Sequence, residues 1–161
     1  MTIVNVDIVP FEATHQTEVD ALMFMISKEF TETIFSPQSK TMKEVSLLPT
    51  DKYWVALANN TVVGTIGFTI LKNNTIALKR MFLSKEYRGK GISKKLLDTV
   101  IDFSDNHKIF CIYLGTMNQF KAAQKFYEKH GFKEVSQATL PIDFAINPVD
   151  TIFYKKELMK L

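Results

Sequence analysis

The chain has 161 residues, of which 46% are hydrophobic, and this length predicts one globular domain, residues 1–161, with a single core. Its net charge of +3 is too small to indicate a nucleic-acid partner by itself. The sequence shows neither a signal peptide nor an apolar run near the roughly 20 residues that span a bilayer, so we expect a cytoplasmic protein without a membrane partner. With one cysteine, Cys111, an intramolecular disulfide is excluded.

The first fifty residues predict one strand and one long helix. Residues Ile3–Val9 alternate as a strand does, and Thr14–Phe30 carry apolar residues along one helical face. The segment Thr31–Thr50 is the least regular part, with a short helix expected over Gln38–Leu48. This segment suits either a substrate-facing lid or an ordinary connection.

Three strands in succession form the next part of the chain. They are expected over Tyr53–Ala58, Val62–Leu71 and Thr75–Leu83. The pairs Asn59-Asn60 and Asn73-Asn74 separate them, and asparagine tolerates the positive φ that tight hairpin turns require. An antiparallel meander is therefore predicted.

A glycine-rich turn, Arg88 to Ser93, follows the third of these strands and opens a predicted helix over Ile92–His107. Gly89 and Gly91 remove Cβ atoms where the helix begins, so backbone N–H groups there can bind an anion, above all a phosphate. From Lys79 to Lys95 the chain has seven basic residues and one acid, which leaves the rest of the chain with a net charge of −3. The sequence therefore predicts that this turn binds a pyrophosphate.

The remaining elements complete a mixed sheet. The apolar run Ile109–Leu114 predicts a buried central strand, parallel to the strand before the glycine turn because a helix connects them. A helix over Gln119–His130 ends at Gly131, and strands are expected over Phe132–Ser136 and Thr151–Glu157. The sum is an α+β domain with helices on both faces of the sheet.

Two motifs in this order resemble the GNAT superfamily of N-acetyltransferases. The first is the family's pyrophosphate loop, here Arg88, Gly91 and Ser93, in which serine departs from the family's small apolar residue. The second is Ala122 to Phe132, which is similar to the family's helix ending in Tyr-Glu-Lys-x-Gly-Phe. The resemblance also covers the element order, from about residue 3 to 157.

The resemblance implies an α/β/α sandwich around a mostly antiparallel seven-stranded sheet, with strands 4 and 5 parallel and splayed. It implies transfer of an acetyl group from acetyl-CoA, as co-substrate and without a metal, to a primary amine by direct attack in a ternary complex. The pantetheine arm would lie along Arg80–Leu83, with an N–H of Phe82 or Leu83 on the thioester carbonyl. The implied cofactor-binding residues are Met81, Phe82, Leu83, Arg88, Gly89, Lys90, Gly91, Ile92, Ser93, Asn118 and Tyr127, and Lys94 or Lys95 could also reach the nucleotide phosphates.

Tyr127 is the catalytic residue that the resemblance implies, as the general acid that protonates the leaving sulfur. Aromatic residues on a helical stripe usually pack in a core, so core packing is the alternative for Tyr127. Many members carry asparagine seven residues before this tyrosine, where this chain has Phe120. Asn118, nine residues before, is the nearby candidate, as cofactor contact, helix N-cap or both.

A general base is not evident in the sequence. Glu29, Glu32 and Asp143 are loose candidates, and Lys79 and Arg80 stand where some relatives carry glutamate. A non-catalytic acyl-CoA sensor of the same fold is therefore the main alternative to an enzyme.

Other binding functions fit less well. A different nucleotide-phosphate-binding protein is one alternative. This chain lacks the P-loop motif of such proteins, because no Gly-Lys-Ser/Thr ends the loop. The three histidines, His15, His107 and His130, lack metal-ligand spacing. The basic cluster has few aromatic residues beside it for stacking nucleic-acid bases.

The acceptor amine stays open between a polyamine, a peptide N-terminus, a lysine side chain and an aminoglycoside. Its site is expected from the 14–50 region, the second and third strands and the loop over residues 137–148. The residues offered there are Phe30, Phe35, Tyr53, Trp54, Asp143 and Phe144. Pairing of the final strands into a homodimer, common in the family, is also expected.

Overall fold

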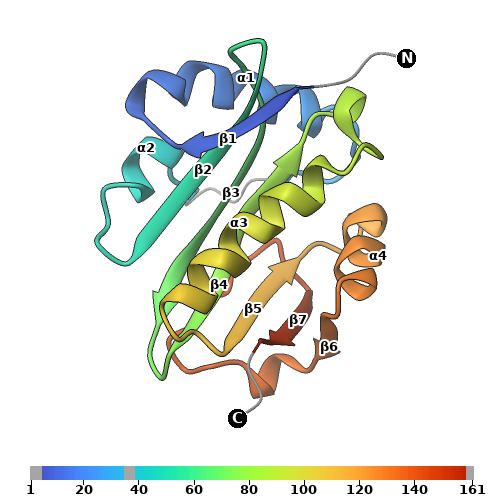
Figure 1. Ribbon diagram of the computed structural model, residues 1–161. Coiled ribbons are helices and arrows are strands. Elements are labelled where there is room, and N and C mark those ends of the chain that lie inside the picture. Colours follow the sequence, from blue (N-terminus) through green and yellow to red (C-terminus); the bar gives the residue numbers. More distant parts are fainter. Residues whose placement is uncertain (1–4, 35–38, 159–161) are drawn as a thin grey trace.

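The computed structural model describes residues 5–34 and 39–158. It contains a seven-stranded sheet in the order β1-β2-β3-β4-β5-β7-β6, with helices on both faces, as predicted (Figure 1). The strands are β1 (Val6–Pro10), β2 (Asp51–Ala58), β3 (Thr61–Leu71), β4 (Thr75–Leu83), β5 (Cys111–Thr116), β6 (Lys133–Val135) and β7 (Ile152–Glu157). The helices are α1 (Gln16–Ser27), α2 (Met42–Val45), α3 (Ile92–Asn106) and α4 (Lys121–Lys129).

The largest departures from the predicted elements lie in the first fifty residues. The first helix begins as a 3-10 turn, Ala13–His15, and α1 ends at Ser27 instead of Phe30. The second predicted helix is the single turn α2, where the Thr41 hydroxyl accepts from the N–H of Glu44 and so caps a short element. The predicted starts at Ile3 and Gln38 lie outside the described residues.

The meander and its turns are as expected. Strands β2, β3 and β4 pair antiparallel in succession. The four asparagines of the two turns have φ values of 50° and 62° in the first and 61° and 56° in the second. The asparagines therefore mark the hairpins for the physical reason inferred from the sequence.

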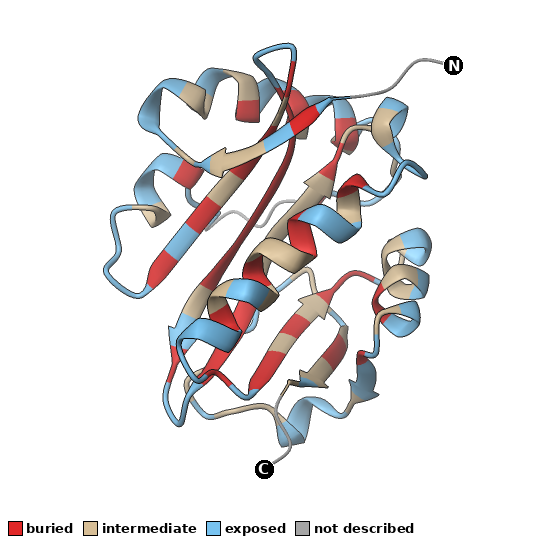
Figure 2. Cartoon of the chain, in the orientation of Figure 1, coloured by how far each residue is buried: buried red, intermediate tan, exposed pale blue. Residues whose placement is uncertain are grey.

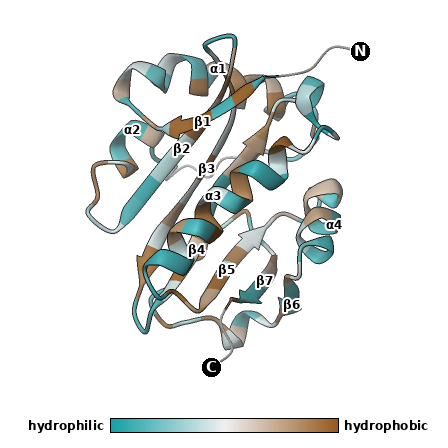
Figure 3. Cartoon of the chain, viewed as in Figure 1, coloured by the Kyte–Doolittle hydropathy of each residue, from teal (hydrophilic) through white to brown (hydrophobic). Residues whose placement is uncertain are grey.

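Two apolar layers cover the two faces of the sheet. Successive residues of β3 belong to opposite layers. Val63 belongs to the cluster that packs under α3, and Val62 belongs to the cluster under α1 and α2. Buried residues follow the strands and the inner side of α3 (Figure 2), while the outer side of α3 is hydrophilic (Figure 3). The core thus fixes the sheet between helices, as an α/β/α sandwich requires.

The parallel pair in the middle of the sheet is short. Strand β4 pairs with β5 only from Thr75 to Ala77, opposite Cys111 to Tyr113. Within the described residues, the remainder of β4, as far as Leu83, has no strand partner on its β5 side. The two strands therefore splay apart as the family resemblance implied.

The far end of the sheet limits how a second copy of the chain could add to it. Strand β7 lies between β5 and β6, so both of its edges are already paired. The edge strand is β6, which has three residues. The homodimer stays a prediction, and the three residues of β7 that pair with β6, Phe153–Lys155, are not free to pair with a partner strand.

A bulge interrupts β4 where the splay begins. Gly67 pairs with Lys79 and Thr65 with Phe82, so the two residues between them in β4 oppose a single residue in β3. Arg80 in this bulge has a φ of 53°, which is uncommon for a residue with a Cβ. The Thr65 hydroxyl donates to the Arg80 carbonyl at 2.7 Å, and Thr65 is fully buried.

Replacing Thr65→Val should therefore destabilise the protein by about 1–2 kcal/mol, because it deprives a carbonyl group of its donor at nearly constant volume. Urea denaturation measures the free energy of unfolding. Thr61→Val, at the exposed start of β3, is the matched control and should change it by less than about 0.5 kcal/mol. Equal effects of the two substitutions would contradict a stabilising role for the Thr65 hydrogen bond.

Candidate active site

A cavity of about 1050 Å³ opens where β4 and β5 diverge. Its walls come from β4 and β5, from the starts of α3 and α4, from α1 and α2, and from the loop before β7. This volume lies at the upper end of the range of ligand pockets, which is roughly 300–1,000 Å³. Of the residues predicted to bind cofactor, those lining the cavity are Met81, Phe82, Leu83, Arg88, Gly89, Ser93 and Tyr127.

The free edge of β4 presents backbone groups to this cavity. The N–H of Ser84 donates to the carbonyl of Val63 in β3 at 2.7 Å. Because successive residues of a strand direct their N–H groups to opposite sides, the N–H of Leu83 points toward the gap and that of Phe82 toward β3. Of the two predicted donors, Leu83 is thus the one with suitable geometry.

The glycine turn leaves a run of N–H groups unpaired. Gly89 and Gly91 have φ values of 75° and 81°, and Gly91 is the N-cap of α3 without any side-chain cap. Among the described residues, the N–H groups from Gly89 to Ser93 have no hydrogen-bond partner. A Cβ on either glycine would meet nothing within 4 Å, so the loop is open to a ligand. An uncapped helix start of this kind suits an anion.

Arg88 is held by the protein itself. Its guanidinium forms two contacts with Glu29, Nη1–Oε1 at 2.5 Å and Nη2–Oε2 at 3.0 Å, and its Nε donates to the carbonyl of Leu83. The backbone N–H of Arg88 donates to the carbonyl of Lys85 at 3.3 Å. Arg88 therefore ties the glycine turn to the end of β4 and to the segment after α1.

The lysines near the turn differ in their partners. Lys94 pairs with Asp98 at 2.6 Å, and Lys95 donates to the carbonyl of Val6. Lys90 lies over the ring of Tyr87, 5.7 Å from its centroid, and has no anionic partner among the described residues. Lys90 is thus the lysine of the three with neither an ion pair nor a hydrogen bond in the described part of the chain. Ile92, by contrast, is buried, so only its backbone can face a ligand.

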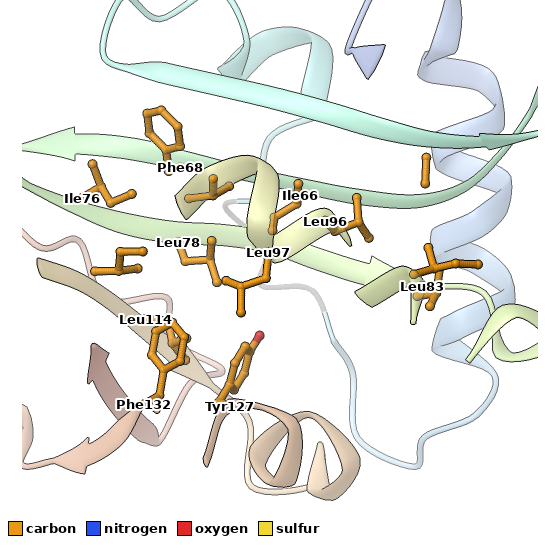
Figure 4. Close-up of a cluster of buried hydrophobic side chains, with 14 of the residues drawn as sticks. Ile66, Phe68, Ile76, Leu78, Leu83, Leu96, Leu97, Leu114, Tyr127 and Phe132 are labelled. Carbon is orange, nitrogen blue, oxygen red and sulfur yellow. The ribbon is translucent and has the colours of Figure 1, made fainter. Parts of the chain in front are cut away.

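The ring of Tyr127 packs in the core, as one of its two predicted interpretations requires, while its role as general acid stays a prediction. Its ring packs in the core, with centroids 5.5 Å from Phe132 and 5.9 Å from Tyr154. Its hydroxyl points away from Phe132, as Figure 4 shows, and has no hydrogen-bond partner in the described part of the chain. Burial, with a smaller contribution from the charge of Asp150, raises the pKa of the Tyr127 hydroxyl.

Asn118 is exposed and does not line the cavity. Its Oδ1 accepts from Lys121 Nζ at 2.8 Å. The predicted N-cap role is wrong, because α4 begins at Lys121 and its N-cap is Phe120. A cofactor contact by Asn118 stays a prediction.

Asp150 is a cavity residue that sequence reasoning missed. It lies just before β7, and a Cβ on Gly115 of β5 would be 3.0 Å from its Oδ2. Burial raises the pKa of its carboxyl to about 6, opposed by the charge of Lys79. No periodicity or motif marks this position, since it sits in an irregular loop two residues after Pro148.

The base candidates named from the sequence are less suited. Glu29 is engaged by Arg88. Glu32 does not line the cavity, and neither does Asp143, whose Oδ2 accepts from the N–H of Lys72 at 2.9 Å. The cavity carboxylates apart from Glu29 are Asp51 and Asp150.

The aromatic residues expected around the acceptor divide between the two faces of the sheet. Phe30, Tyr53 and Phe144 line the cavity. Trp54 instead packs against Phe68 on the α3 side. Phe35 lies outside the described residues.

Other chemistries find little support in the geometry. Within residues 5–34 and 39–158, no three His, Cys, Asp or Glu side chains are grouped to hold a metal ion. Cys111 is buried, which raises the pKa of its thiol. No helix in the described ranges has the length and apolar character needed to cross a bilayer.

The acetyltransferase (GNAT) family model matches residues 19–132 of the chain. The N-acetylaspartate synthetase of Danio rerio is 35% identical over 107 residues, which are 64% of this chain and 38% of that protein. The human N-acetylaspartate synthetase is 36% identical over 88 residues, 54% of this chain and 29% of that protein. The chain thus spans about a third of the length of these curated relatives.

Solved structures are similar over nearly the whole chain. A GNAT-family acetyltransferase from Staphylococcus aureus Mu50 has a TM-score of 0.89 and 34% identity, with 96% of this chain and all of that one covered. A PaiA N-acetyltransferase from Thermoplasma acidophilum, solved in complex with coenzyme A, has a TM-score of 0.75 at 22% identity, covering 95% of this chain and 99% of that one. The second likeness concerns the fold alone.

Proposed function

We propose, because the chain belongs to the acetyltransferase (GNAT) family, that it transfers an acetyl group from acetyl-CoA to a primary amine by direct attack in a ternary complex. The observation that carries the proposal is the convergence of three features on one cavity. These are the free edge of β4, the unpaired N–H groups of the glycine turn and the hydroxyl of Tyr127.

Donor binding would use mainly backbone groups. The N–H groups of Gly89, Lys90, Gly91, Ile92 and Ser93 would hold the pyrophosphate, with the Lys90 ammonium near the nucleotide. Met81, Phe82 and Leu83 would line the pantetheine arm, and the N–H of Leu83 would polarise the thioester carbonyl. Arg88 would act as a positioning residue, because its side chain is bound to Glu29 and Leu83.

The proton transfers would involve two side chains. The acetyl thioester supplies an acyl group activated for attack by a neutral amine. As the new C–N bond forms, Asp150 would accept the proton of the amine nitrogen, and as the C–S bond breaks, Tyr127 would give its hydroxyl proton to the sulfur. The non-catalytic acyl-CoA sensor was an alternative because the sequence shows no general base. Asp150 is a candidate for that base, so an enzyme is the better supported function.

The acceptor would be a small-molecule amine. Two of the relatives are named N-acetylaspartate synthetase, after an acetylated amino acid. An acceptor of that size beside the donor in the cavity agrees with this name.

Replacing Tyr127→Phe should lower kcat about 100-fold or more while changing the Kd for coenzyme A less than about threefold, because the hydroxyl acts on the leaving group. Steady-state release of thiol and calorimetric titration with coenzyme A measure the two quantities. Tyr113→Phe, which removes a hydroxyl outside the cavity, is the control and should leave kcat within threefold. Unchanged kcat in Tyr127→Phe would remove this residue from the mechanism.

For Asp150, the expected readout is a pH profile. A base must be ionised, and burial raises the pKa of Asp150 to about 6, so kcat/KM should fall about tenfold per pH unit below pH ~6. Asp150→Asn should lower the plateau about 100-fold and abolish this acidic limb.

Asp143→Asn is the matched control, because its carboxylate bonds to Lys72 outside the cavity, and it should keep the wild-type profile. An acidic limb that persists unchanged in Asp150→Asn would assign the base elsewhere.

A further inference from the structure

Two cationic side chains stand next to each other where the acceptor would bind. Lys79 and Arg80 lie at the bulge of β4 and both line the cavity. The chain has only two arginines, Arg80 and Arg88, and both line the cavity. The two arginines differ in their partners. Arg88 is paired with Glu29 through both terminal nitrogens of its guanidinium, whereas Arg80 has no such pair among the described residues.

Neither Lys79 nor Arg80 has a carboxylate within ion-pair distance in the described residues, where three ion pairs occur. Arg80 Nη2 donates to the carbonyl of Lys40, and Lys79 Nζ donates to the carbonyl of Ala145 at 3.5 Å. Residues 1–4, 35–38 and 159–161 include no Asp or Glu. Among the described residues, the hydrogen-bond partners of both cations are therefore neutral.

The carboxylate charges that act on Lys79 are those of Asp150 and Asp51, and those that act on Arg80 are those of Asp51 and Glu44. None of these carboxylates forms an ion pair with either cation in the described residues. Asp51 Oδ2 accepts from the Tyr53 hydroxyl at 2.7 Å, and its Oδ1 accepts from Thr50 at 2.9 Å. Asp150 influences Lys79 through its charge without forming an ion pair. Partial burial lowers the pKa of the Lys79 ammonium and of the Arg80 guanidinium, which reports the cost of removing their charges from water.

Charges that are withdrawn from water without a partner destabilise a folded protein, unless a ligand supplies the opposite charge. A guanidinium fork beside an ammonium suits a carboxylate, which can accept from both. A polyamine or aminoglycoside would instead bring more positive charge to these two cations. Asp150, which also lines the cavity, offers a negative charge to the ammonium form of an amine.

Resting on the function proposed above, we infer that the acceptor is an amine that carries a carboxylate, in the manner of an amino acid. Its carboxylate lies between Arg80 and Lys79, and its amino group faces Asp150. The cavity thus carries charges of both signs, as a zwitterionic acceptor does.

The experiment compares amino acids with their primary carboxamides, which keep the amine and remove the negative charge. With acetyl-CoA saturating, kcat/KM for the preferred amino acid should exceed that for its amide about 100-fold. In Arg80→Gln this ratio should fall below about tenfold, and Arg80→Lys should give an intermediate value because the fork is lost. Lys43→Gln, which removes an exposed charge outside the cavity, is the control and should keep the wild-type ratio.

Calorimetry with coenzyme A bound measures the affinities for the same acid and amide pairs, independently of turnover. Thermal melts verify that each variant folds. An amide that reacts and binds as well as its acid, or a ratio unchanged in Arg80→Gln, would overturn the inference while leaving the acetyltransferase function intact. Binding that prefers the acid, with no thiol released for any amine, would support the carboxylate site and contradict the proposed function.

Discussion

The early divergence of β4 from β5 is the constraint on which the rest of this structure depends. Parallel pairing ends at Ala77, and six residues of β4 then lack a partner on that side in the described chain. An unpaired strand edge inside a domain has to be satisfied by water or by a ligand. Here it borders a cavity, and the bulge at Arg80 directs two cationic side chains into the same region. These two deviations from regular pairing, one on each side of β4, thus border both halves of the proposed site.

The half of the proposed site that would bind the donor is predictable from the sequence because it depends on local chemistry. Glycine at a helix start and asparagine at a hairpin turn are both favoured because the backbone there has a positive φ. These residue types can therefore be recognised in the sequence. Helix α3 and strands β2 to β4 therefore begin and end close to the predicted positions. Arg88 was also marked by its motif, although its side chain proves to be occupied by Glu29, 59 residues away in sequence.

The acceptor half was not predictable in the same way. Asp150 matters because the loop before β7 brings it against Gly115, a contact that only the folded sheet creates. Lys79 and Arg80 stand where some relatives carry glutamate, but their lack of ion-pair partners among the described residues is a property of packing. The failed N-cap at Asn118 has a similar origin, because α4 starts two residues later than its pattern indicates.

We propose that the open edge of β4 and the uncapped start of α3 together bind the donor. Amide hydrogen exchange, followed by NMR with and without acetyl-CoA, measures whether these groups bind the donor. We expect strong protection of the Leu83 amide, which would bond to the thioester carbonyl, and of the amides from Gly89 to Ser93, with no change at the Asn59-Asn60 and Asn73-Asn74 turns. Saturable binding of acetyl-CoA that leaves those amides unprotected would show that the donor binds elsewhere.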